Sequence, residues 1–142
     1  MKNRKTAFLT IFAILALLPL LTAMSALQGE SPDKVPTPAK KFLATFIDQT
    51  DETTDCREAS IDGETFLEGK RGSGTNTIPF ENIREVSFLL QGEKLNGIVK
   101  LHDGNVFELA LNKNQRAYGK TKYGNFQIKL SDLKKMTLSR PH

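Results

Sequence analysis

Apolar and polar residues alternate along most of the chain after residue 41, and no long stretch there has the 3.6-residue period of an amphipathic helix. Gly and Asp residues interrupt the alternation at short intervals, as they do in turns between strands. The pattern predicts an all-β fold, a small sandwich or barrel of about 8–10 short strands, with two small SH3-like barrels as the alternative. The expected strands are 42–47, 56–61, 65–68, 77–80, 86–90, 95–101, 106–111, 117–122, 126–130 and 136–138.

Turn residues separate these expected strands. Asp62-Gly63 and Asp103-Gly104 are typical of tight hairpin turns, because both central residues of such a turn need positive φ. Segment 69–74 contains three glycines and predicts a loop or a bulged segment. Pro79 has no amide hydrogen to donate, so its strand should lie at a sheet edge or end there.

An internal repeat relates two parts of the chain at an offset of 50 residues, since Gly119 aligns with Gly69. Each copy alone would expose an apolar face, so the two are expected to pack together in a duplicated β domain. The Asp-Gly turns align at a shorter offset of 41, which predicts a nine-residue insertion around Ala110–Ala117. The other aligned pairs are Lys70 with Lys120, Gly74 with Gly124, Ile78 with Ile128, Phe80 with Leu130, Ile83 with Leu133, Val86 with Met136 and Phe88 with Leu138.

The second copy has the sequence Gly119-Lys-Thr-Lys-Tyr-Gly-Asn-Phe-Gln-Ile-Lys-Leu-Ser-Asp-Leu-Lys-Lys-Met. Over residues 56–138 this signature of strands and turns resembles small exported bacterial β-domain proteins of unassigned function. The resemblance implies an all-β fold and nothing about mechanism. Lys129 stands in this copy where the first copy has Pro79.

The first 26 residues have the layout of a secretory signal peptide, with three basic residues, a largely apolar run from Ala7 to Leu21 and small residues after it. Cleavage after Ser25 or Ala26 is expected, and the alternative is an uncleaved inner-membrane anchor through residues 6–27. Either way the domain is expected outside the cytoplasm, in the periplasm or the medium. Pro-rich residues 27–41 predict an extended linker, which leaves 42–140 as the β domain.

The net charge is close to zero once the export segment is set aside, because that segment holds three bases and no acid. The formal charge of +4 then falls to +1, which does not predict nucleic-acid binding. Residues 48–68 carry eight acids and one base, and residues 113–140 carry eight bases and one acid. These runs predict either strand faces that attract each other in the fold or opposite faces for partners, including head-to-tail self-assembly.

Cys56 is the single cysteine, so the exported domain has no internal disulfide and depends on its core. A structural thiol is expected, with an intermolecular disulfide or a redox role as alternatives. A Cys56–His102 dyad would support a thiol-dependent enzyme. However, Cys56 lies in an alternating strand and not at a helix N-terminus, where a thiolate is favoured. We therefore expect no catalytic site.

No motif predicts a metal ion or a cofactor. The acids of segment 48–55 lack the alternating ligands and central glycine of an EF-hand loop. The sequence has no Cys or His pair at zinc-binding spacing. Segment 69–74 lacks the Gly-Lys-Ser/Thr ending of a phosphate-binding loop.

Basic and aromatic residues interleave in the second copy, which predicts a core residue at Phe126 and an exposed basic strand face, with a stacking surface as the alternative. The basic C-terminal half is the candidate surface for an anionic envelope polymer or for an acidic face on an envelope protein. The first-ranked prediction is an exported, non-enzymatic binding or structural domain of the cell envelope. Membrane contact is expected only through residues 6–27, if they are not cleaved. The candidate binding residues are Lys120, Lys122, Tyr123, Lys129, Lys134 and Lys135.

Overall fold

The computed structural model describes residues 35–140, which form ten antiparallel strands, two single-turn 3-10 helices and no α-helix. The all-β prediction is therefore confirmed, with a strand number inside the expected range. The strands are β1 (Leu43–Asp48), β2 (Thr53–Ile61), β3 (Phe66–Arg71), β4 (Gly74–Pro79), β5 (Ile83–Gln91), β6 (Lys94–Leu101), β7 (Val106–Leu111), β8 (Arg116–Thr121), β9 (Gly124–Lys129) and β10 (Leu133–Ser139), and the 3-10 helices are η1 (Phe80–Asn82) and η2 (Leu130–Asp132).

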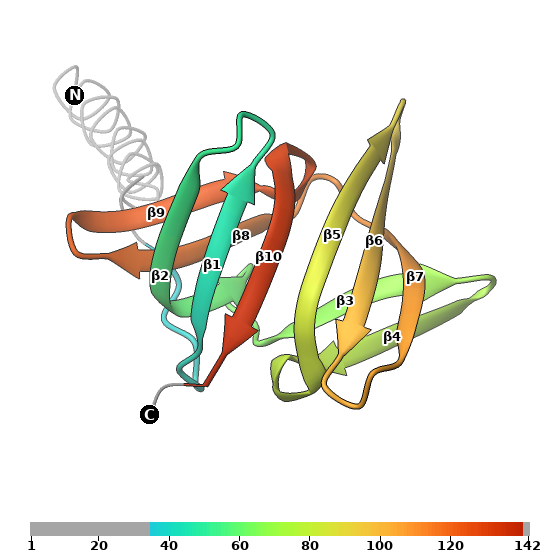
Figure 1. Ribbon diagram of the computed structural model, residues 1–142, viewed down its shortest axis with the longest axis horizontal. Helices are drawn as coiled ribbons and strands as arrows, with labels where there is room; N and C mark the ends of the chain where they lie inside the picture. The colour runs from blue at the N-terminus through green and yellow to red at the C-terminus, as the bar shows by residue number, and fades with distance from the viewer. Residues whose placement is uncertain (1–34, 141–142) are drawn as a thin grey trace, which may run out of the picture. The chain divides into compact units, whose positions relative to one another are not determined.

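All ten strands belong to one curled sheet, in the order β4-β3-β7-β6-β5-β10-β1-β2-β8-β9 (Figure 1). The central neighbours β5 and β10 pair between Glu85–Ser87 and Lys135–Thr137. Their pairing joins two five-stranded parts, which we call half A (β3 to β7) and half B (β1, β2 and β8 to β10). The chain therefore does not form two separate barrels, because both halves share one hydrogen-bonded sheet.

The two halves have the same strand arrangement when each is followed from its own edge of the sheet to the centre. Each strand of half A therefore has a counterpart in half B at the same distance from the edge. At the centre Val86 pairs with Met136, and these residues differ by the same 50 positions as the aligned glycines. Thus β3, β4, η1 and β5 correspond to β8, β9, η2 and β10, while β6 and β7 correspond to β1 and β2. An origin of the two halves by duplication stays a prediction.

The two Asp-Gly turns do not occupy corresponding places, contrary to their alignment at an offset of 41. Asp103-Gly104 lies in the turn of the β6–β7 hairpin as predicted, but of the two only Gly104, at +90°, has the expected positive φ. Asp62 and Gly63 have the expected positive φ, +50° and +86°, but β2 then pairs with β8, while β3 pairs with β4 and β7. The predicted hairpin at Asp62 is therefore wrong, because this turn carries the chain from half B into half A. The two sides of the turn pair only through one isolated bridge, between Ile61 and Glu64.

Two further predictions concern the β3–β4 hairpin. Segment 69–74 is not a loop, since β3 continues to Arg71 and a tight turn at Gly72, with a φ of +62°, leads into β4. Pro79 ends β4 at one edge of the sheet, as its missing amide hydrogen required.

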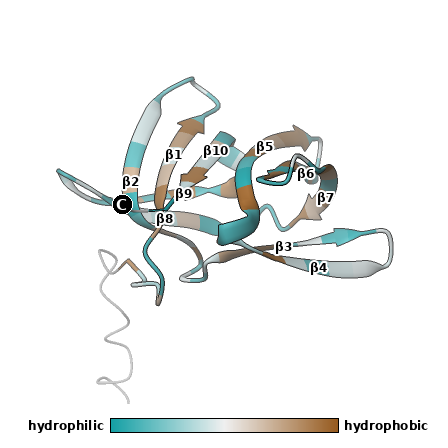
Figure 2. Ribbon diagram, turned by 60° about the horizontal axis from the view of Figure 1, so that its bottom comes forward, coloured by the Kyte–Doolittle hydropathy of each residue, from teal (hydrophilic) through white to brown (hydrophobic). Residues whose placement is uncertain are grey.

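Both halves contribute to a single hydrophobic core. In half B the β8–β9 hairpin runs across β1, β2 and β10, and in half A the β3–β4 hairpin runs across β5, β6 and β7 (Figure 1). Hydrophobic and hydrophilic segments alternate along the strands, so each strand turns one face inward (Figure 2). The rings of Phe42 and Phe80 meet edge to face between the halves, with their centroids 5.6 Å apart.

Residues 35–41, which the sequence assigned to the linker, lie against the domain. Pro38 is buried, and Lys40 and Lys41 form ion pairs with Glu81 and Glu58. The predicted signal peptide and residues 27–34 of the predicted linker lie outside the described residues. Within residues 35–140 no helix is long and apolar enough to cross a membrane.

Candidate functional site

A bulge interrupts the pairing of β2 with β8. The register against β8 shifts between Arg57 and Ser60, and Glu58 has a φ of +52°. A positive φ is uncommon for a residue with a Cβ and persists only where the surroundings hold it. Here the next amide, that of Ala59, donates a hydrogen bond of 3.0 Å to the carbonyl of Phe42. Such bulges redirect side chains and are frequent beside functional sites.

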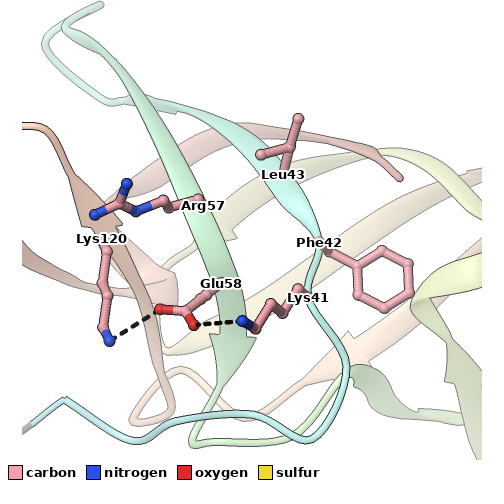
Figure 3. Close-up of a pocket in the computed structure, with 6 residues that line it drawn as sticks. All are labelled: Lys41, Phe42, Leu43, Arg57, Glu58 and Lys120. Carbon is pink, nitrogen blue, oxygen red and sulfur yellow. Dashed lines mark ion pairs between the residues drawn. The ribbon is translucent and has the colours of Figure 1, made fainter. Parts of the chain in front are cut away.

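The bulge places the Glu58 carboxylate between two lysines from distant parts of the chain (Figure 3). One carboxylate oxygen is 2.9 Å from Nζ of Lys120, and the other is 3.8 Å from Nζ of Lys41. The hydrogen bond from Lys120 lowers the pKa of Glu58, and the positive charges of Lys120, Lys41 and Arg57 add to this effect. Glu58 therefore stays ionised at neutral pH and fixes both lysines.

An open hollow of about 410 Å³ surrounds this carboxylate, between the start of β1, the middle of β2 and the end of β8 (Figure 3). A neighbouring hollow of about 360 Å³ shares Leu43, Arg57 and Lys120 with it. We call the two together the β2 groove.

Cations outnumber anions in the β2 groove. Glu58 engages two of the cations, whereas Arg57 has no ion-pair partner among residues 35–140. A guanidinium presents parallel N–H donors that match a carboxylate or a phosphate. Chemically, the groove can therefore hold an anion beside Arg57. Its cations are Lys41, Arg57, Lys120 and Lys122, and its anions are Asp55 and Glu58.

Half A has a hollow of about 290 Å³ in the corresponding place, with different charges. Lys70, the counterpart of Lys120, pairs across the strands with Ala110, whereas Lys120 pairs with Arg57. The charged residues that line this second hollow are Lys70 and Glu68, which balance each other. The β2 groove therefore has an excess of positive charge, whereas the corresponding hollow of half A has none.

The six residues predicted to bind do not gather on one surface. Lys120, Lys122 and Tyr123 lie together at the end of β8 and in the β8–β9 turn, and two of them line the β2 groove. Lys129 lies at the other end of this hairpin, opposite Arg116.

Lys134 and Lys135 lie on β10, with β1 and β2 between them and β8. They form ion pairs with Asp51 and Glu85. The pair Lys134–Asp51, like Lys120–Glu58 in the groove, joins the basic run to the acidic run. Two ion pairs thus join the acidic run to the basic run, on the two sides of the β1–β2 region that lies between β10 and β8.

Sequence reasoning missed Lys41, Arg57 and Glu58 as site residues. Lys41 belonged to the predicted linker, and nothing local predicts a bulge at Glu58. The one signal was that Arg57 is the single base within the acidic run 48–68.

Cys56 is a buried core residue of β2 that packs beneath Gly119 of β8. Burial, with a smaller effect of the Asp55 charge, raises the pKa of its thiol to about 11. His102 lies in the turn after β6 of half A, and β1, β10 and β5 separate β2 from β6 in the sheet. The structure therefore does not bring Cys56 and His102 together.

Cys56 should react with a chromogenic disulfide reagent more than 100-fold more slowly in the folded protein than in denaturant at pH 8. A thiol with a pKa of about 11 is ionised in roughly 0.1 % of molecules at that pH, against about 10 % at the ordinary pKa of 9.0, and burial slows access further. Because the pKa is raised, the folded-state rate should rise about tenfold per pH unit up to pH 10. Equal rates in the two states would contradict this placement of the thiol.

The carboxylate of Asp48 holds the backbone of the acidic β1–β2 loop. Oδ1 of Asp48 accepts hydrogen bonds from the Thr50 hydroxyl, the Thr50 amide and the Glu52 amide, at 2.7 to 3.0 Å. These bonds lower the pKa of Asp48. In the described part of the chain, no group of three or more acids, histidines or cysteines is arranged to hold a metal ion.

Comparison with known proteins gives one match. A family model described as "Uncharacterised protein" matches residues 38–141, which is most of the chain. No curated protein and no solved structure matches the chain significantly.

Proposed function

Because the chain belongs to this family of uncharacterised proteins, its activity has to be inferred from its own surface, and we propose that it is an exported, non-enzymatic binding domain of the cell envelope. Its β2 groove binds an anionic group. The observation that carries the proposal is Arg57, a guanidinium without an ion-pair partner among residues 35–140, which lies beside Lys120 in an open groove where two lysines already engage Glu58.

The state of the titratable groups supports binding rather than catalysis. Glu58 is kept ionised by two lysines, which makes it a poor general acid. The thiol of Cys56 is kept protonated and lies beneath Gly119, which makes it a poor nucleophile. A thiol-dependent enzyme would also need His102 near Cys56, and these lie in different halves of the sheet.

The proposed ligand is an anionic envelope polymer, or an acidic face on an envelope protein. Export is proposed from the signal-peptide layout of residues 1–26. The groove is open to solvent along β1 and β8, so a long chain can enter it sideways. Head-to-tail self-assembly is less well supported, because two ion pairs already join the acidic run to the basic run within one molecule.

Arg57→Glu should lower the affinity for labelled polyphosphate and labelled polygalacturonate by about tenfold or more, since charge-assisted hydrogen bonds are worth roughly 1.5–3 kcal/mol. Fluorescence anisotropy at low and at high salt measures this loss, and the wild-type affinity should fall as salt rises.

The protein is taken from the envelope fraction of an export-competent host, so a chain retained in the cytoplasm would contradict export.

Lys70→Glu is the matched control, because it changes the net charge equally at the place in half A that corresponds to Lys120. Its affinity for both polymers should stay within about twofold of the wild type. If both variants lose affinity equally, net charge and not the groove governs binding. If the wild type binds neither polymer, the proposal is wrong.

A further inference from the structure

An exposed aromatic residue in the β8–β9 turn, Tyr123, directly follows a lysine of the β2 groove. Lys122 lines the groove, and its ammonium lies 4.9 Å from the ring centroid of Tyr123. The ring stacks on nothing else in the described part of the chain, and Tyr123 is 87 % exposed. It is the one aromatic among the large apolar residues exposed within residues 35–140.

The turn that carries Tyr123 is held in a defined shape. The Thr121 hydroxyl donates a hydrogen bond of 3.0 Å to the Gly124 carbonyl and accepts one of 3.1 Å from the Tyr123 amide. The Gly124 φ of +142° completes the reversal of the chain. The ring is therefore presented from a fixed backbone, with Lys122 on one side.

An aromatic face carries partial negative charge and attracts weakly positive C–H groups as well as cations. Sugar rings offer such C–H groups on their less polar faces, and acidic sugars add a carboxylate to the same unit. Lys120 and Tyr123 are three positions apart in the chain, so their Cα atoms lie at most about 10 Å from each other. A ligand that uses both must present an anionic group and a stacking ring at that separation.

We propose that the anionic ligand is an acidic polysaccharide. Arg57 and Lys120 bind the carboxylate of one sugar unit, and Tyr123 stacks on the ring of a neighbouring unit. The inference rests on the proposed function of the β2 groove and names the class of polymer that it takes. Lys122 lies between these two contacts in the chain. Its ammonium attracts the polymer's carboxylates and also packs on the ring of Tyr123.

A single-stranded nucleic acid also combines anionic groups with flat rings, but the described residues fit it less well. Platforms for single strands use several aromatic residues for successive bases and a strongly basic groove. Here one aromatic is exposed, and residues 35–140 carry 16 bases and 14 acids. A single-stranded nucleic acid is therefore the alternative ligand, and oligo-dT serves as its probe in the test.

Tyr123→Ala should weaken binding of labelled polygalacturonate by about fivefold or more, while polyphosphate, which has no rings, should change by less than about twofold. Tyr123→Phe keeps the aromatic face and should bind both polymers like the wild type. Tyr123 lies in an exposed turn away from the core, so these variants should fold. Anisotropy titrations of the whole protein with both polymers and with oligo-dT give all the comparisons.

Equal effects of Tyr123→Ala on polygalacturonate and polyphosphate, or no effect on either, would overturn the inference and leave the anion-binding groove intact. Tighter, Tyr123-dependent binding of oligo-dT would overturn it in favour of a nucleic acid. Failure of the groove itself has a different signature, because Arg57→Glu would then leave the binding of polyphosphate unchanged.

Discussion

Phe80→Ala should lower the free energy of unfolding by about 3–5 kcal/mol and shift the melting of the whole domain in one transition. Phe80 is 1 % exposed, and its ring meets that of Phe42 at a centroid distance of 5.6 Å. Phe80 belongs to half A, whereas Phe42 directly precedes β1 of half B. The cavity would thus open where the two halves meet, and both should be destabilised together.

Calorimetry and far-ultraviolet circular dichroism with increasing denaturant measure this effect. Val106→Ala is the control, because Val106 is 54 % exposed and its truncation should cost less than about 0.5 kcal/mol. Two separate transitions, with loss confined to one, would contradict a single cooperative sheet joined at β5 and β10.

Gly119→Ala should cost about 1–3 kcal/mol of folding free energy through overpacking. A Cβ at Gly119 would lie 2.5 Å from Cβ and 2.9 Å from Sγ of Cys56, closer than real side chains approach. Gly69 has the same relation to Leu109 in half A, where an added Cβ would lie 2.8 Å from Cβ of Leu109. A glycine at this place lets β8 or β3 cross closely over the strand beside it.

A double-mutant cycle tests that cause. Cys56→Gly removes the Cβ that the new methyl group would meet, so the double variant should be more stable than the sum of the single effects by about 1 kcal/mol or more. Gly74→Ala is the control, since the nearest atom to its added Cβ is 3.7 Å away, and it should be nearly neutral. Additive effects of Gly119→Ala and Cys56→Gly would show that the contact with Cys56 is not the reason for the glycine.

Most strands were predictable because the alternation of apolar and polar residues is a local property of the chain. Segment 95–101 became β6 within one residue at its start, and 106–111 became β7 without change. The Asp103-Gly104 hairpin followed from local turn chemistry in the same way. Pro79 correctly predicted a strand at the sheet edge, because a missing donor has the same consequence in any β fold.

The errors arose where the partner of a strand lies far away in the sequence. Asp62 and Gly63 have the backbone of a tight turn, but the strands that they join belong to different halves. Local chemistry can specify that the chain reverses, whereas it cannot specify which strand it then meets. For the same reason the 41-residue alignment of the Asp-Gly turns paired two turns with different places in the sheet.

The candidate site was predicted only in part. Lys120, Lys122 and Tyr123 were identified from their interleaved charges and ring, and they do lie together. Arg57 and Lys41 were missed because the groove depends on the bulge at Glu58 and on the packing of residues before β1. Such a site is assembled from three separate segments, and no spacing within one of them reveals it.

The sequence by itself determined the all-β class and the punctuation of most strands, because these depend on residues close together in the chain. Only the tertiary structure decided that β5 and β10 join the two halves, that Cys56 lies buried beneath Gly119, and that Arg57 finds no ion-pair partner among residues 35–140. Those outcomes depend on which distant strands pair and on which charges are compensated there, and both are properties of the folded sheet as a whole.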